Sequence, residues 1–300
     1  MKSYLDCIPC FFRQLLEGAR IMRATDKAQK KVINNFARLI PELSLASNPP
    51  EIARNAYALL KKISSNGDPY KEIKEKSNRL ALSLYPKLKN KVAHSKDRLL
   101  CAIELAIAGN VIDFGVKNNV DVEAELKKIL SEESRRVAKK SIFHYAEFKS
   151  ALKKAHKILY LADNCGEVVF DRVLIEEINN LYPGKAIDYA VKEKPVINDA
   201  LLEDAKKCGI NRIAKIISNG TDAPGTILNL CSGKFKAVFK TADMIISKGQ
   251  GNFESLSNEK KPIFFLFMVK CPVVARNTGC KMGHTVLLYN SKKGIFRKGW

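Results

Sequence analysis

Hydrophobic residues in the first half of the chain recur every three or four positions, which is the spacing of one face of an α-helix. In the segment 26–40 this face is formed by Val32, Ile33, Phe36, Ala37 and Ile40. Asp26 stands where a helix N-cap is expected. The same spacing predicts further helices over residues 51–63, 70–88, 99–111, 122–130 and 145–156. We therefore predict an all-helical first domain, residues 1–150, which could consist of two helical lobes.

After residue 156 the pattern changes to short apolar runs separated by helical stretches. Strands are predicted at residues 157–162, 186–191, 212–217, 244–247, 263–268 and 285–288. Helical stretches between them cover residues 168–180, 199–208, 226–230 and 251–256. Alternating strands and helices are typical of a mainly parallel sheet with right-handed crossovers. The predicted fold class is therefore α/β, with a Rossmann-like second domain over residues 151–300.

The apolar runs are too short to cross a membrane. The longest, residues 263–269, has the length of a strand, whereas a membrane helix needs about 20 apolar residues. The N-terminus lacks the apolar core of a signal peptide, so we expect a soluble cytoplasmic protein without a membrane partner. Its eight cysteines are expected to be mainly reduced thiols, because a chain of 300 residues does not need disulfides for stability.

The chain is strongly basic, with 52 Lys and Arg against 31 Asp and Glu and a net charge of +21. A basic surface attracts nucleic acid or anionic substrates, but it is also found on heat-adapted proteins. The lysines are dispersed along predicted helices, and no basic tail, zinc finger or RNA-binding aromatic motif is present. We therefore do not expect nucleic acid as a partner.

Polar residues and glycines follow five of the predicted strands at the point where each strand ends. After the first strand come Asp163, Asn164, Gly166 and Glu167. The later clusters are residues 192–199, 218–226, 247–254 and 270–272. The carboxyl ends of parallel strands meet at the same edge of a sheet, where ligands bind in open α/β folds. The five clusters therefore predict one site.

Each cluster also has an ordinary structural explanation. Asp163 and Asp199 can simply be helix N-caps. Lys248 and Lys270 are two of many lysines, and the glycine loop 249–251 lacks the Lys-Ser/Thr ending of a Walker sequence. The joint placement of the clusters at successive strand ends favours a functional site.

Three of these side chains have the donor atoms of a divalent-cation site. Asp163, Asn164 and Asp199 offer the oxygen ligands that Mg²⁺ and Mn²⁺ prefer. Such a cation withdraws charge from phosphorus and lowers the pKa of its water, while Lys248 or Lys270 could neutralise phosphoryl oxygens. Asp163 could instead be a nucleophile that forms an aspartyl phosphate. Because the chain lacks an Asp-x-Asp-x-Thr loop, we favour water activated by the metal.

A Cys-x-x-Cys motif near the N-terminus, Cys7 and Cys10, is open to three interpretations. It can be a redox pair, half of a metal site, or two small residues buried at the start of a helix. A second Cys-x-x-Cys, which a four-thiolate zinc site needs, is absent.

In this combination and order the motifs resemble the DUF89 family, also called the damage-control phosphatase or ARMT1-like family, and in particular its subfamily with an N-terminal Cys-x-x-Cys. The resemblance covers essentially the whole chain. The motifs that carry it are Cys7-x-x-Cys10, Ala108-Gly109-Asn110-x-x-Asp113, Asp163-Asn164-x-Gly166-Glu167, Asn198-Asp199, Gly249-Gln250-Gly251-Asn252 and Lys270-Cys271-Pro272.

The resemblance implies a metal-dependent phosphatase in which Asp163, Asn164 and Asp199 hold the metal and Lys270 is also catalytic. It implies Mn²⁺, Ni²⁺, Co²⁺ or Mg²⁺ as cofactor, a role in metabolite damage control, and small phosphorylated metabolites as substrates, such as sugar phosphates, phosphopantetheine or damaged nucleotides. The residues then expected to bind substrate are Asn110, Asp113, Glu167, Ser218, Lys248, Gln250, Gly251, Asn252 and Lys270. Some eukaryotic relatives have Arg-Thr-x-Lys where this chain reads Phe267-Met268-Val269-Lys270. The substrates of those relatives are therefore not assigned to this chain.

Two other functions stay open from the residues alone. A basic protein of this kind could bind nucleotides or nucleic acid without chemistry, which the net charge of +21 would favour. A Rossmann-like sheet could also belong to a nucleotide- or S-adenosylmethionine-using transferase, although no Gly-x-Gly-x-x-Gly follows the first predicted strand.

Overall fold

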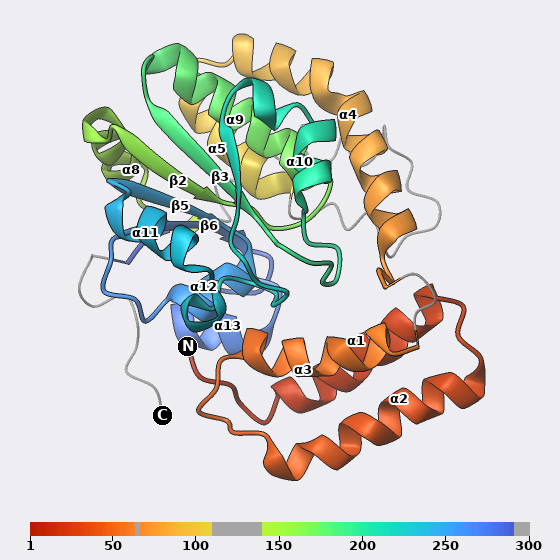
Figure 1. Cartoon of the computed structure of the whole chain (residues 1–300). Coiled ribbons are helices and arrows are strands. Elements are labelled where there is room, and N and C mark those ends of the chain that lie inside the picture. The colour runs from red at the N-terminus through yellow and green to blue at the C-terminus, as the bar shows by residue number, and fades with distance from the viewer. Residues whose placement is uncertain (64–66, 110–139, 291–300) are drawn as a thin grey trace.

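A seven-stranded sheet forms the centre of the protein in the computed structural model, which describes residues 1–63, 67–109 and 140–290 (Figure 1). The strands are β1 (Lys140–Phe143), β2 (Lys157–Leu161), β3 (Ala186–Val191), β4 (Lys215–Ser218), β5 (Met244–Lys248), β6 (Ile263–Met268) and β7 (Thr285–Tyr289). Their order across the sheet is β1-β7-β6-β5-β2-β3-β4. All neighbours are parallel except β6 and β7, which are antiparallel. The fold is therefore α/β with a mainly parallel sheet, as predicted.

Helices cover both faces of this sheet (Figure 1). They are α1 (Cys7–Ile21), α2 (Asp26–Leu39), α3 (Pro49–Lys61), α4 (Lys71–Ala93), α5 (Arg98–Ala108), α8 (Tyr145–Lys154), α9 (Glu167–Leu181), α10 (Leu202–Lys207), α11 (Gly233–Thr241), α12 (Gln250–Leu256) and α13 (Pro272–Thr278). Local signals set several starts. Asn48 and Glu51 form a capping box at α3, and the side chains of Thr25 and Asp97 accept backbone hydrogen bonds at α2 and α5.

Two hydrophobic core clusters lie on opposite faces of the sheet. Because successive side chains of a strand point to opposite faces, Ile158 and Tyr160 of β2 belong to one cluster and Leu159 and Leu161 to the other. The first cluster joins the sheet to α4, α5, α8 and α9. The second joins it to α1, α2, α3, α11, α12 and α13.

The N-terminal helices fall into two groups. Helices α4 and α5 pack on α9, whereas α1, α2 and α3 pack on one another and α3 reaches α12. Figure 1 shows the second group, in red and orange, gathered below α12 and α13. The division into domains at residue 150 stays a prediction.

Some elements differ from those that the sequence predicts. The strand expected from residue 212 starts at Lys215, because Ile210–Arg212 forms a 3-10 turn after Gly209, whose φ is +83°. Residues 226–230, predicted to be helical, contain only the 3-10 turn Leu228–Leu230. The hydrophobic pattern did not predict β1, α1, α11 or α13, and the predicted helix 122–130 lies outside the described residues. Within those residues, no helix is long and apolar enough to span a bilayer.

Candidate functional site

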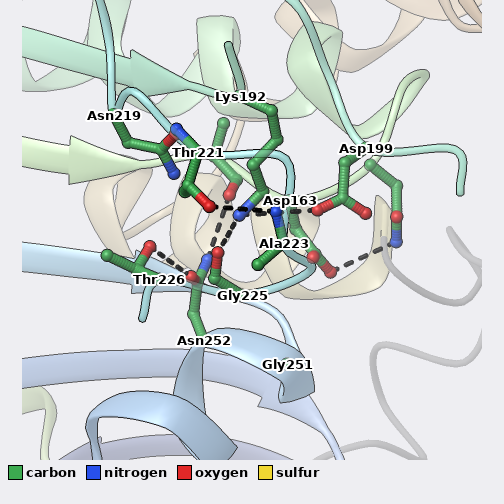
Figure 2. A network of polar contacts seen from close by, with 12 residues as sticks. Asp163, Lys192, Asp199, Asn219, Thr221, Ala223, Gly225, Thr226, Gly251 and Asn252 are labelled. Atoms are coloured by element: carbon green, nitrogen blue, oxygen red, sulfur yellow. Dashed lines mark hydrogen bonds and ion pairs between the residues drawn. The ribbon is translucent and has the colours of Figure 1, made fainter. Parts of the chain in front are cut away.

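The segments that follow β2 and β3 bring three of the predicted ligands together. Asn164, just after β2, forms an isolated antiparallel bridge with Asp199, in the loop after β3. Beside this bridge, the amide of Ala200 donates to the carbonyl of Asp163 at 2.9 Å. Figure 2 shows the carboxylates of Asp163 and Asp199 at this edge of the sheet. Residues that are distant in the sequence therefore meet in one place.

The carboxylate of Asp163 lies against the loop that follows β5. Gly249 begins this loop with a φ of +80°, and a Cβ atom at this position would overlap with the carboxylate of Asp163. Glycine alone tolerates both the positive φ and the close approach. The sequence of the loop thus determines how near Asp163 can lie to the start of α12.

The side-chain amide of Asn164 is held by two carboxylates. Its Nδ2 donates to Asp163 Oδ2 at 3.2 Å and to Glu167 Oε1 at 2.9 Å. From the other side, the amide of Gly166, whose φ is +82°, donates to Asn78 Oδ1 of α4 at 2.8 Å. Helices α4 and α9 together therefore fix the loop that carries Asp163 and Asn164.

Lys192, the first residue after β3, is a member of the site to which the sequence analysis gave no role. Its side chain is buried, and its Nζ lies 3.5 Å from Asp199 Oδ2 and donates to the carbonyl of Gly225 (Figure 2). It therefore connects the loop after β3 to the loop after β4. A lysine at a strand end is visible in the sequence, but its burial is not.

Acidic groups crowd this edge of the sheet. Burial, and next the charge of Asp199, raises the pKa of Asp163, while Lys270 and Lys192 oppose this rise. Burial likewise raises the pKa of Asp199, against the charge of Lys192, and burial raises the pKa of Glu167 against Lys248. The ionised forms of these carboxyls are therefore disfavoured as they stand, and additional positive charge would stabilise them.

The donor set fits a hard divalent cation. Asp199 Oδ2 is buried and, apart from the ion-pair contact with Lys192 Nζ at 3.5 Å, has no hydrogen-bond partner among the described residues, so it is an acceptor that a cation could contact. The set consists of two carboxylates and one amide, and within the described ranges no three His, Cys, Asp or Glu side chains form a metal-binding group. Oxygen donors of this kind suit Mg²⁺ and Mn²⁺.

Asn252 and Gly251 lie in the first turn of α12, close to the segment after β4. The Asn252 side chain is fully buried, accepts from Thr226 Oγ1 at 2.7 Å and donates to the carbonyls of Ala162 and Lys248 at 3.0 and 2.8 Å. Its hydrogen-bonding capacity is thus used inside the protein. Gly251 packs against Gly225, and a Cβ at Gly225 would overlap with the carbonyl of Gly251.

Lys270 and Gln250 lie on the more open side of the site. Lys270 is exposed, and its backbone amide donates to Gln250 Oε1 at 2.9 Å. Gln250 Nε2 donates to Glu254 Oε1 at 2.8 Å and approaches Cys271 Sγ at 3.5 Å. The positive charge of Lys270 opposes the rise in the pKa of Asp163.

Other residues expected to bind substrate are placed differently. Lys248 is fully buried and pairs with Glu167 and Asp171, so its ammonium group is turned into the interior. Ser218 ends β4, and its hydroxyl donates to Glu193 Oε2. Asn110 and Asp113 lie outside the described residues, so their predicted role is not tested by the structure.

Cys7 and Cys10 occupy the first turn of α1. Both are free thiols, Cys7 buried and Cys10 partly buried, and Cys10 Sγ accepts a hydrogen bond from Gln14 at 3.3 Å. Burial raises the pKa of the Cys7 thiol, which reduces its reactive thiolate form. The three interpretations of this pair stay open.

The sequence and the structure of this chain are similar to those of known proteins. Residues 3–286 match the damage-control phosphatase ARMT1-like domain. A Methanocaldococcus jannaschii protein of uncharacterised function is 38% identical over 94% of each chain. A Pyrococcus horikoshii protein named damage-control phosphatase is 36% identical, over 98% of this chain and 100% of that protein. The crystal structure of a DUF89 family protein from Pyrococcus horikoshii is 35% identical and superposes with a TM-score of 0.87, covering 97% of this chain and 99% of that one.

Proposed function

We propose a function from one premise: the chain belongs to the damage-control phosphatase ARMT1-like domain family. The protein is proposed to be a divalent-metal-dependent phosphatase that hydrolyses small phosphate monoesters in metabolite damage control. The name of the relative from Pyrococcus horikoshii supports the phosphatase and damage-control parts. The metal-dependent part rests on one observation, the meeting of Asp163, Asn164 and Asp199 at one edge of the sheet.

In this proposal Asp163, Asn164 and Asp199 hold the cation through their side-chain oxygens. A bound Mn²⁺, Mg²⁺, Co²⁺ or Ni²⁺ ion supplies Lewis-acid chemistry, which withdraws charge from phosphorus and lowers the pKa of water. Lys192, buried beside Asp199, offsets part of the negative charge of the carboxylates. The buried Oδ2 of Asp199, which has no hydrogen-bond partner among the described residues, is consistent with a cation at this place.

Lys270 is proposed to bind the phosphoryl group of the substrate. It is exposed at the edge of the site, and Gln250 fixes its backbone through the hydrogen bond at 2.9 Å. A lysine ammonium binds phosphate as a compact point charge and suits many different esters. This arrangement supports a substrate class defined by its phosphate group, such as sugar phosphates or damaged nucleotides, rather than one particular metabolite.

Hydrolysis of p-nitrophenyl phosphate by the purified protein tests the proposal. We expect turnover to stop with EDTA and to return with Mn²⁺. The Asp163→Ala variant should lose several kcal/mol of transition-state stabilisation, which corresponds to a rate loss on the order of 1,000-fold. Asp26→Ala, which changes an exposed carboxylate on α2, is the matched control and should retain the wild-type rate. Activity that persists in Asp163→Ala, with its fold verified by circular dichroism, would refute the proposal.

A further inference from the structure

A group of fully buried charges lies beneath the proposed ligands. Lys248 of β5 is 0% exposed, and its Nζ contacts Asp171 Oδ1 of α9 at 2.6 Å and Glu167 Oε2 at 3.2 Å. The hydroxyls of Tyr160 and Tyr189, from β2 and β3, donate to the two oxygens of Asp171 at 2.7 and 2.8 Å. Strands β2, β3 and β5 and helix α9 therefore share one network of ion pairs and hydrogen bonds.

Burying such a network costs free energy, because its charged groups lose their hydration. Each buried ion loses several kcal/mol of hydration, and replacing buried ion pairs with apolar side chains of similar size is often neutral or stabilising. Lys248 lies on the same side of β5 as Ile246, which packs in the core cluster toward α9. An apolar residue at position 248 would therefore serve packing as well. The lysine calls for a reason other than stability, and its contact with Glu167 provides one.

Glu167 connects the buried charges to the site. Its Oε2 accepts from Lys248, and its Oε1 accepts from Asn164 Nδ2 at 2.9 Å. The same Nδ2 donates to Asp163 Oδ2 at 3.2 Å. An amide nitrogen carries two hydrogens, so both are directed at carboxylates. Rotating the amide by half a turn would place Oδ1 against two carboxylate oxygens, so the orientation with Nδ2 toward Asp163 and Glu167 is favoured.

We propose that Glu167, held in place by Lys248 and Asp171, is a positioning residue that fixes the amide of Asn164 with its Oδ1 directed to the metal. This inference rests on the proposed function, because it concerns the same site. It assigns to Glu167 and Lys248 a role other than substrate binding, and their side chains are buried, at 2% and 0% exposure. Partners that orient a ligand in this way keep it ready for the ion before binding.

Binding of Mn²⁺ to the full chain, measured by isothermal titration calorimetry, tests this role without any substrate. Glu167→Gln keeps the shape of the side chain but offers one oxygen to two donors, Lys248 and Asn164. Glu167→Asp keeps the negative charge but is one methylene shorter, so its carboxylate is drawn back from Asn164. We expect the Kd for Mn²⁺ to rise about 10–100-fold in both variants, as is typical for partners of metal ligands.

The matched control is Glu177→Gln. Glu177 lies on the same helix, is 1% exposed and pairs with Arg98 at 2.7 Å, so it shares the burial and the charge of Glu167 without contact to Asn164. Its substitution should leave the Kd for Mn²⁺ unchanged. A role of Glu167 in general stability would instead affect both glutamates alike.

A double variant separates orientation from packing. When Asn164→Asp is added to Glu167→Gln, donor and acceptor exchange places and the net charge of the pair is conserved. The introduced amide then donates to the introduced carboxylate, so Glu167→Gln should tighten Mn²⁺ binding when it is made in Asn164→Asp, the reverse of its effect in the wild type. Comparison with Asn164→Asp alone cancels the effect of the added carboxylate on the ion. Wild-type affinity in both Glu167→Asp and Glu167→Gln would overturn the positioning role and leave the metal site standing. No Mn²⁺ binding by the wild type would overturn the metal site and, with it, this inference.

Discussion

At the scale of single residues, strand-end position was readable from the sequence and side-chain orientation was not. Asp163, Asn164 and Asp199 could be selected because each lies near the end of a predicted parallel strand. Lys192 is one of 52 basic residues, and its contact with Asp199 follows from burial that no local pattern encodes. Lys248, in contrast, was predicted to belong to the site but does not face it. It also ends a strand, but the alternation of β5 turns it toward α9 and away from the site.

Glu254 leads to a pH-dependent stability at this scale. Burial raises its pKa from 4.5 to about 7. A carboxyl whose pKa is raised by folding contributes stability that is complete below its unfolded pKa and is lost as the pH rises through about 7. Glu254→Gln should therefore be more stable than wild type at pH 8 by on the order of 1–3 kcal/mol, with no gain at pH 4. Urea unfolding at both pH values measures the difference, and an equal difference at both would contradict the prediction.

At the scale of elements, the hydrophobic pattern predicted six of the seven strands of the described sheet. Its failures have local causes. Residues 226–230 have helical spacing, but the amide of Thr226 donates to Ser255 Oγ at 2.9 Å and its hydroxyl to Asn252 at 2.7 Å. These contacts with α12 hold the segment outside a helix. Because polar contacts between loops depend on tertiary placement, a pattern of apolar residues does not contain them.

Asn252 forms hydrogen bonds with the segments that follow β2 and β4 and with the end of β5. Removing its side chain should therefore lower the free energy of unfolding. Asn252→Ala leaves the hydroxyl of Thr226 and the carbonyls of Ala162 and Lys248 without this buried partner. We expect a loss on the order of 3 kcal/mol in the free energy of unfolding. In the control Asn277→Ala, the lost hydrogen bond lies within α13, and the cost should stay within about 1 kcal/mol. Urea unfolding compares the two, and similar losses would argue against the joining role of Asn252.

At the scale of the whole molecule, the site lies at one edge of a sheet that is covered by core clusters on both faces. The group α1, α2 and α3 reaches this edge through Arg54 of α3, which pairs with Asp222 at 2.6 Å in the loop after β4. This pair is partly exposed, and such pairs contribute at most about 1 kcal/mol. The position of these helices therefore depends mainly on the apolar residues of their core cluster.

If the cation binds only the folded protein, it should stabilise the whole chain. A ligand present at 100 times its Kd adds about 2.7 kcal/mol to the free energy of unfolding, which corresponds to a rise of several degrees in Tm. We expect Mn²⁺ to raise the Tm of the wild type, measured by calorimetry, and to leave the Tm of Asp199→Asn nearly unchanged. The comparison within each variant, with and without the ion, removes the effect of the substitution itself. An equal rise in both would place the ion elsewhere.

The pairing of β1 with β7 has a consequence for how the chain is made. Lys140 of β1 pairs with Thr285 of β7, and among the described residues β7 is the one strand beside β1 in the sheet. During translation, β1 leaves the ribosome long before the segment that will hydrogen-bond to it has been synthesised. Until then its backbone groups form an open edge of the kind to which other chains can add. The nascent protein thus completes its sheet only once β7 has been synthesised, and the interval before that is when an unpaired strand edge favours aggregation.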